Sequence, residues 1–201
     1  FVCVAEAMVE LGRVDEALAW ARRGIAETDG WQVAKLYDLA ADLLAGHQDA
    51  AAVLTLRREQ HRRTPSSSTY AALQTVARAL GAWDAERGEA RNVLAARDPA
   101  GLVDALLSDG AADEAWAAAT RGDWSPQDRQ WKRLAEAREP TDPSSAVGVY
   151  LRLADGLLVA ANKGAYRDAV RYLTAARRAA SSGWCWSMAP RPRSTCAGAR
   201  T

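Results

Sequence analysis

The sequence predicts an all-α protein built as a right-handed stack of helix hairpins, and three observations predict this fold. Apolar residues recur with the spacing of a helix that buries one side. The phrase that begins at Gly12 returns at Gly110 and, most clearly, at Gly164, which indicates an internal repeat. The composition is rich in Ala, Leu and Arg, contains one Phe, and lacks the runs of β-branched residues typical of strands. The clearest apolar stripe consists of Val14, Ala17, Leu18, Ala21 and Ile25.

Glycines and one capping aspartate mark the ends and starts of the first four predicted helices. Gly12 and Gly46 are predicted to break helices, and Gly30 suits the left-handed residue that closes one. Asp49 supplies a side chain that can cap the next helix. These helices are expected over 1–11, 14–28, 31–45 and 49–63.

The next four helices are bounded by proline as well as glycine. Pro65 stops the preceding helix, because the residue before proline is driven out of the helical region. Ser66 offers a cap, Gly81 a break, and Asp98 followed by Pro99 a strong start signal. These helices are expected over 66–80, 84–97, 98–108 and 113–120.

The last three helices complete a total of eleven, with no strands. Pro126 and Pro143 each follow a residue that can cap a helix. These helices are expected over 125–138, 142–162 and 165–180. Residues 181–201 have no helical period, which predicts a disordered or aberrant tail; a shifted reading frame near residue 181 is the sharper hypothesis for it.

The glycine breaks give the repeat its period. The first two intervals between breaks are 34 and 35 residues, which match the period of about 34 residues of a tetratricopeptide repeat, whereas the next two are 29 and 54. The sequence therefore predicts one tetratricopeptide-like domain over 1–180, regular over 1–97 and irregular over 98–180. Stacked hairpins bury a continuous core that one hairpin cannot bury alone.

Two phrases resemble the second-helix signature of tetratricopeptide repeats: Gly12-x-Val14-x-Glu16-Ala17-Leu18, and the phrase from Gly164 to Val170. A closer resemblance, over about residues 1–180, is to the C-terminal helical region of bacterial SWIM zinc-finger family proteins. The matching runs are Glu16 to Trp31, Leu56 to His61, Pro65 to Leu73 and Leu134 to Pro140.

The SWIM resemblance implies a helical region that works beside a zinc motif of the form Cys-x-Cys…Cys-x-His, thought to bind DNA or protein. This chain lacks that motif, because its three cysteines and two histidines do not fit the spacing. Zinc and any activity tied to it are therefore not carried over, and no cofactor is expected. The chain begins at Phe1 within an apolar helix pattern, which suggests a piece of a longer bacterial protein.

Charge and cysteine content narrow the class of protein. A net charge of +1 argues against a generally polyanionic partner. An odd number of cysteines without metal or redox spacing predicts a reduced, cytoplasmic compartment. No apolar run approaches the roughly 20 residues that cross a bilayer, so no membrane association is expected.

Possible catalytic groups are sparse, and we expect no enzyme. Asp38 and Asp42 share a helix face, but a solvated face explains them better than acid–base or metal chemistry. His61 lies near Ser66 in the sequence, but no third group is placed to orient such a pair. Lys163 precedes Gly164 where a phosphate-binding loop needs a lysine after glycine.

Two other clusters have a functional and a structural interpretation. A basic run could follow nucleic-acid phosphates, or it could offset the dipole at the end of a helix. This run contains Arg57, Arg58, Arg62 and Arg63. Trp116, Trp124 and Trp131 could anchor a partner, or they could fill the space between unequal helix pairs.

The sequence therefore favours a non-enzymatic protein-interaction or scaffold module that binds a protein or peptide along the first helices of its hairpins. The polar candidates on those helices are Lys35, Asp38, Asp42, Gln74 and Arg78. The alternative is a nucleic-acid-associated module that acts with a zinc finger outside this chain, through the arginines of the basic run.

Overall fold

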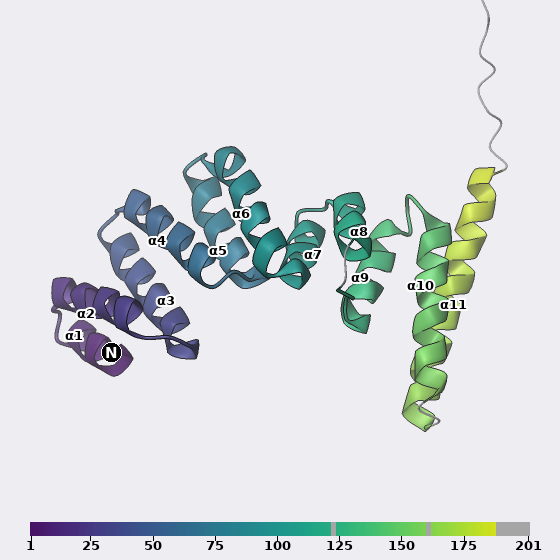
Figure 1. Cartoon of the computed structure of the whole chain (residues 1–201), viewed down its shortest axis with the longest axis horizontal. Helices are drawn as coiled ribbons and strands as arrows, with labels where there is room; N and C mark the ends of the chain where they lie inside the picture. The colour runs from purple at the N-terminus through teal and green to yellow at the C-terminus, as the bar shows by residue number, and fades with distance from the viewer. Residues whose placement is uncertain (122–123, 160–161, 188–201) are drawn as a thin grey trace, which may run out of the picture. The chain divides into compact units, whose positions relative to one another are not determined.

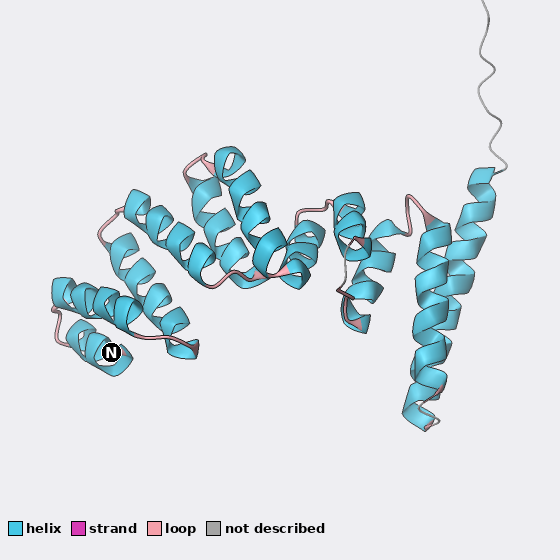
Figure 2. Cartoon of the chain, in the orientation of Figure 1, coloured by secondary structure: helices cyan, strands magenta, loops and turns pink. Residues whose placement is uncertain are grey.

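The computed structural model describes residues 1–121, 124–159 and 162–187, and in these ranges it contains eleven helices and no strand (Figures 1 and 2). The all-α prediction and the number of helices are confirmed for the described part. The helices are α1 (Val2–Glu10), α2 (Val14–Glu27), α3 (Trp31–Gly46), α4 (Ala50–Arg63), α5 (Ser67–Ala79), α6 (Trp83–Arg97), α7 (Pro99–Ser108), α8 (Ala112–Thr120), α9 (Asp128–Arg138), α10 (Pro143–Leu158) and α11 (Lys163–Ser187).

The chain divides into two compact units, α1–α7 up to Ser108 and α8–α11 from Asp109 onward. The single repeat domain over 1–180 stays a prediction. The last helix differs from its expected end, because α11 continues past Ala180 to Ser187. The rest of the tail that the sequence predicts to be disordered or aberrant lies outside the described residues.

One turn recurs through the first unit, after α1, α3 and α5. At the first, the N–H of Gly12 donates to the carbonyl of Val9 at 2.9 Å and the N–H of Arg13 donates to that of Met8 at 2.8 Å. This pair of bonds is the Schellman motif, which satisfies carbonyl groups at a helix end and needs a left-handed residue. Gly12 is that residue, with a φ of 70°.

The same pair of bonds forms around Gln48 and Gly81. Their N–H groups donate to Ala45 at 2.9 Å and to Arg78 at 3.0 Å, and the N–H groups of the following residues donate to Leu44 at 3.1 Å and Ala77 at 2.8 Å. The φ angles are 60° at Gln48 and 66° at Gly81. The hairpin turns are therefore 36 and 33 residues apart.

Helix α3 ends at the predicted break, but the left-handed residue of the turn is not the glycine. Gly46 is the last residue of α3, and the left-handed residue is Gln48. A residue with a Cβ in this conformation costs roughly 1–2 kcal/mol. The two turn bonds and the burial of Leu44 next to them hold Gln48 there.

In the first unit, buried residues recur at fixed distances along the sequence from the turn residues. The thirteenth residue after each turn residue is buried: Ile25, His61 and Leu94. Tyr37 and Tyr70 each lie eleven residues before a turn, and both are buried. Equivalent residues thus fill equivalent places in successive hairpins, although a histidine occupies one apolar position.

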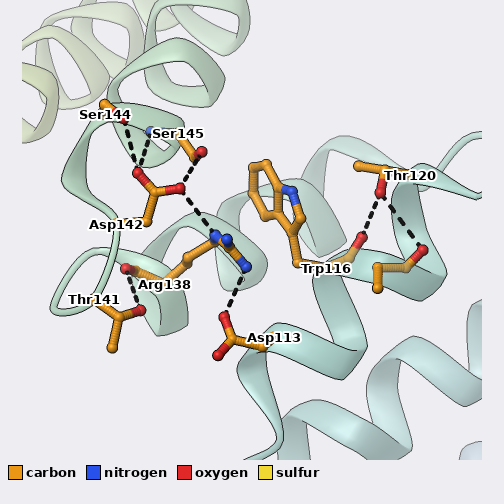
Figure 3. Close-up of polar contacts among 9 residues, drawn as sticks. Asp113, Trp116, Thr120, Arg138, Thr141, Asp142, Ser144 and Ser145 are labelled. Carbon is orange, nitrogen blue, oxygen red and sulfur yellow. Dashed lines mark hydrogen bonds and ion pairs between the residues drawn. The ribbon is translucent and has the colours of Figure 1, made fainter.

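The second unit is held by aromatic and charged side chains between its helices. Trp116 of α8 and Trp131 of α9 pack edge to face, with ring centroids 5.7 Å apart. Arg138 lies 5.0 Å from the Trp116 ring and donates to Asp113 at 2.8 Å and to Asp142 at 3.3 Å (Figure 3). Trp116 and Trp131 therefore pack against each other between α8 and α9, and the two interpretations of the tryptophan cluster stay predictions.

Aspartate caps the start of α10, which packs along α11. The Asp142 carboxylate accepts hydrogen bonds from the backbone and hydroxyl of Ser145 and from the hydroxyl of Ser144 (Figure 3). These hydrogen bonds, led by that from the Ser145 side chain, hold the pKa of Asp142 well below its usual range.

Candidate binding groove

A groove opens in the first unit between α2 and α4. It has a volume of about 560 Å³. Its lining consists of Arg22, Ile25, Ala26, Leu44, Ala52, Thr55, Leu56 and Glu59. Ile25, Leu44 and Leu56 are nearly buried and form an apolar floor, whereas Arg22, Thr55 and Glu59 are exposed polar residues. An apolar floor with a few polar groups is typical of a binding site.

The groove exists because α2 and α4 stand apart over α3. Both helices lie wholly in the described part of the chain, and no Cα atom of α2 comes within 8 Å of one in α4. Both helices pack on α3, which places Leu44 beneath the gap. The α2–α3 contact is close at Gly24, where an added Cβ would lie 2.7 Å from Leu36.

A second hollow of about 500 Å³ continues along α4. It is lined by Thr55, Arg58, Glu59, Arg62 and Arg63. Thr55 and Glu59 line both hollows, so the groove surface extends over the outer face of α4.

Arg63 links α4 to the end of α2. Its guanidinium donates to the carbonyl oxygens of Ile25 and Thr28, the latter at 2.8 Å, and to Asp29 at 2.8 Å. The carbonyls at the end of a helix have no partner within it, so a cation that binds them stabilises that end. Because Ile25 also lines the groove, Arg63 fixes the backbone at part of its floor.

Glu59 is held in place on the opposite wall. It accepts a hydrogen bond of 3.0 Å from the hydroxyl of Tyr37. Burial, with the neighbouring Glu59 carboxylate, raises the pKa of Tyr37 to about 12. Tyr37 therefore remains a hydrogen-bond donor at neutral pH and orients the Glu59 carboxylate.

Helices α4 and α6, unlike α2 and α4, contact each other and are also joined by side chains. Arg58 donates to both carboxylate oxygens of Glu86, at 2.8 and 2.7 Å. The buried His61 contacts the Thr69 hydroxyl through Nδ1 and the Ala90 carbonyl through Nε2, both at 3.0 Å. A carbonyl oxygen can only accept, so Nε2 carries a proton. Burial lowers the pKa of His61, which favours the neutral ring, and in that ring Nδ1 accepts from the Thr69 hydroxyl.

The predicted partner-binding residues lie elsewhere in the first unit. Three are exposed on α3: Lys35, Asp38 and Asp42; Gln74 and Arg78 lie on α5. None of the five lines either of the two hollows described above. Asp38 is bound to Arg57 at 2.7 Å, and Lys35 lies 5.1 Å from the ring centre of Trp31. Their role in binding stays a prediction.

The four arginines of the alternative nucleic-acid patch all face carboxylates. Arg57 pairs with Asp38, Arg58 with Glu86, and Arg63 with Asp29, each through contacts of 2.7–2.8 Å. Arg62 is 3.9 Å from Glu89, and both side chains are mostly exposed. These carboxylates offset much of the positive potential that would attract phosphates.

The second unit contains a cavity of about 420 Å³ formed by α9, α10 and α11. Its charged groups pair with one another: Lys132 with Glu136, and Arg171 with Asp168. Arg178 pairs with Glu139, which also accepts a hydrogen bond from Tyr150. The hydrogen bond from Arg178 is the main reason why the pKa of Glu139 lies below its ordinary value. This cavity therefore offers few charges that are not already paired.

Sequence reasoning missed the groove residues Arg22, Thr55 and Glu59. For Arg22 the available signal was positional: this residue and Arg58 are each the tenth residue after a left-handed turn residue. That register is visible only once Gln48, and not Gly46, is recognised as the turn residue.

No protein-family model matches this chain, and neither does any curated protein or any solved structure. The resemblance to SWIM zinc-finger proteins therefore stays a prediction. None of the described helices has both the length and the apolar character needed to span a bilayer. Within the described residues, no three His, Cys, Asp or Glu side chains gather as a possible metal site.

Proposed function

We propose that this chain is a non-enzymatic helical-repeat module that binds a peptide segment of a partner protein in the groove between α2 and α4. The observation that carries this proposal is the groove itself, which has a floor of Ile25, Leu44 and Leu56 between polar walls. Peptide segments commonly bind by inserting apolar side chains into such grooves.

The regular turns of the first unit support the repeat architecture. The same Schellman turn recurs at Gly12, Gln48 and Gly81, as expected for tetratricopeptide-like hairpins. Stacked hairpins of this kind present extended surfaces that suit a scaffold role. The partner surface proposed here lies along the second helices of the first two hairpins, in place of the first-helix residues that the sequence favours.

Substitutions in the groove, compared with substitutions on the exposed surface of α3, test the proposal. The full chain is used to select binders from a displayed library of random dodecapeptides, and the affinities of selected peptides are then measured by fluorescence polarisation. Thr55→Trp and Ala26→Trp, both at exposed groove positions, are expected to weaken binding at least tenfold, as expected for a blocked site. Circular dichroism checks that these variants fold.

The matched control is a double variant on α3, Lys35→Ala with Asp42→Ala. It is expected to bind the selected peptides as the wild type does. Loss of binding in this control, with wild-type affinity in the two groove variants, would refute the groove and support the first-helix surface instead.

The nucleic-acid alternative is tested by a salt titration with single-stranded and duplex DNA. Because the four arginines face carboxylates, we expect no binding at about 50 mM salt, where phosphate contacts are strong. Binding that disappears in the double variant Arg58→Ala with Arg62→Ala would establish the alternative and contradict the peptide-binding proposal.

A further inference from the structure

Two arginines in the first unit occupy equivalent positions but have different surroundings. Arg22 on α2 and Arg58 on α4 are each the tenth residue after a left-handed turn residue. Arg58 is held by Glu86, which is the fifth residue after the next turn residue, Gly81. The corresponding fifth residue after Gln48 is Val53, which is buried. The chain therefore supplies a carboxylate for Arg58 and an apolar side chain at the equivalent place for Arg22.

Arg22 has no acidic partner within the described residues. Its side chain is exposed and lines the groove, and no described carboxylate lies within 4.0 Å of its guanidinium. The adjacent Arg23 pairs with Glu27 at 2.8 Å and lies 5.4 Å from the Trp20 ring centre. Arg22 is thus a cation at the edge of an apolar floor, without the bidentate contact that its equivalent makes.

We propose that Arg22 recognises an acidic side chain of the bound peptide, in the way that Arg58 holds Glu86. A guanidinium binds a carboxylate through two parallel hydrogen bonds, which gives both direction and strength. The ligand is a peptide segment in which Asp or Glu lies beside an apolar residue. The carboxylate binds Arg22, and the apolar side chain rests on Ile25, Leu44 and Leu56.

The opposite wall adds a second condition on the peptide. Glu59 is fixed there by Tyr37, so its negative charge is held at the groove. Like charges brought together at an interface are unfavourable. The groove therefore selects an acid on the α2 side and a neutral or basic residue on the α4 side, which gives the bound segment a direction.

This inference rests on the proposed peptide-binding function, and a charge-reversal experiment tests it separately. The probe is the same displayed library of random dodecapeptides, selected in parallel on the full-length wild type and on Arg22→Glu. The control is Arg87→Glu, which makes the same change in charge at an exposed position on α6 outside the groove lining. Wild type and Arg87→Glu are expected to enrich an acid beside an apolar residue, and Arg22→Glu to enrich Lys or Arg at that position.

A second measurement uses one selected peptide and its version with the acid replaced by the corresponding amide. The amide version is expected to bind the wild type roughly tenfold more weakly, as for the loss of one charge-assisted bidentate contact. On Arg22→Gln the two peptides should bind equally, because the cation that distinguishes them is gone.

The outcomes separate the two proposals. The role of Arg22 would be overturned if Arg22→Glu still preferred acidic peptides, or if the wild type selected peptides without an acid. The groove function would stand in either case if Thr55→Trp still blocked binding. Selected peptides that bind Thr55→Trp and Ala26→Trp with wild-type affinity would overturn the groove function and, with it, this inference. A library that yields no peptide would overturn both.

Discussion

Arg97 on α6 follows Arg63 on α4 by 34 residues, and each binds the end of the second helix of the preceding hairpin. Arg63 donates to carbonyl oxygens of Ile25 and Thr28 near the end of α2. Arg97 donates to those of Arg62 and Arg63 at the end of α4. One side chain per hairpin thus joins successive second helices through their backbones, which accounts for the repeat of this residue type.

Replacing either arginine is expected to lower the free energy of unfolding of the first unit, and the effect should be larger for the more buried Arg63. Arg63→Met should lower the free energy of unfolding by about 1–2 kcal/mol, because partly buried carbonyls lose charged donors. Arg97→Met should cost under about 1 kcal/mol, since Arg97 is exposed. Urea denaturation measures both, with Arg87→Met as an exposed control on α6. A wild-type midpoint for Arg63→Met would contradict the bridging role.

His61 makes the stability of the first unit depend on pH. Burial lowers its pKa below the ordinary value of 6.5, so the folded state takes up a proton less readily than the unfolded state. The contribution of neutral His61 is fully present above pH 6.5 and is lost as the pH falls below 6.5 toward the folded-state pKa. Urea midpoints at pH 7.5 and 5.5 should therefore fall with decreasing pH.

His61→Leu provides the matched variant, because Ile25 and Leu94 fill the equivalent positions. In this variant the urea midpoints at pH 7.5 and pH 5.5 should differ less than they do in the wild type. His47→Gln, at an exposed histidine, is expected to retain the wild-type difference. An identical pH dependence in His61→Leu and wild type would show that other groups cause it.

Opposite substitutions at two equivalent turn positions should have opposite effects. Gln48→Gly removes the strain of a left-handed residue that bears a Cβ. Glycine also raises the entropy of the unfolded chain, so the net stabilisation should be only about 0.5 kcal/mol. Gly81→Ala should destabilise it by about 1 kcal/mol through backbone strain alone, because nothing lies within 4 Å of the added Cβ. Thermal unfolding followed by circular dichroism compares the two. Stabilisation by both variants would refute the equivalence of the turns.

Two substitutions of Asp142, which caps α10, distinguish the effect of its hydrogen bonds from the effect of its charge. Asp142→Ala should lose the bonds from Ser144 and Ser145 and destabilise the start of α10 by about 1–2 kcal/mol. Asp142→Asn should keep Oδ1 as the acceptor for the Ser145 N–H and the Ser144 hydroxyl, and lose the acceptor that binds Arg138 and the Ser145 hydroxyl, at a cost of about 0.5–1 kcal/mol. Hydrogen exchange of the first turn of α10 measures both. Equal exchange in the two variants would contradict the capping role.

The sequence predicted the helices well because their start and stop signals are local. Pro143 after Asp142, and Ser66 before α5, act through the backbone of one turn. The turn at Gln48 could not be placed, because Gly46 was the more favourable residue by propensity and the hydrogen bonds of Leu44 and Ala45 decided the position. The groove could not be placed either, since it depends on how far α2 and α4 stand apart and on which of two equivalent arginines finds a carboxylate.

His61 also restricts how the number of helix hairpins in the first unit could be changed. Its two ring nitrogens need the Thr69 hydroxyl and the Ala90 carbonyl, which the third hairpin supplies. A deletion or duplication of one hairpin at this junction would place the imidazole against a neighbour without those groups, and an unsatisfied buried polar side chain is costly. The second and third hairpins are therefore a matched pair, and we expect recombinants that exchange hairpins to tolerate new junctions on either side of the pair but not within it.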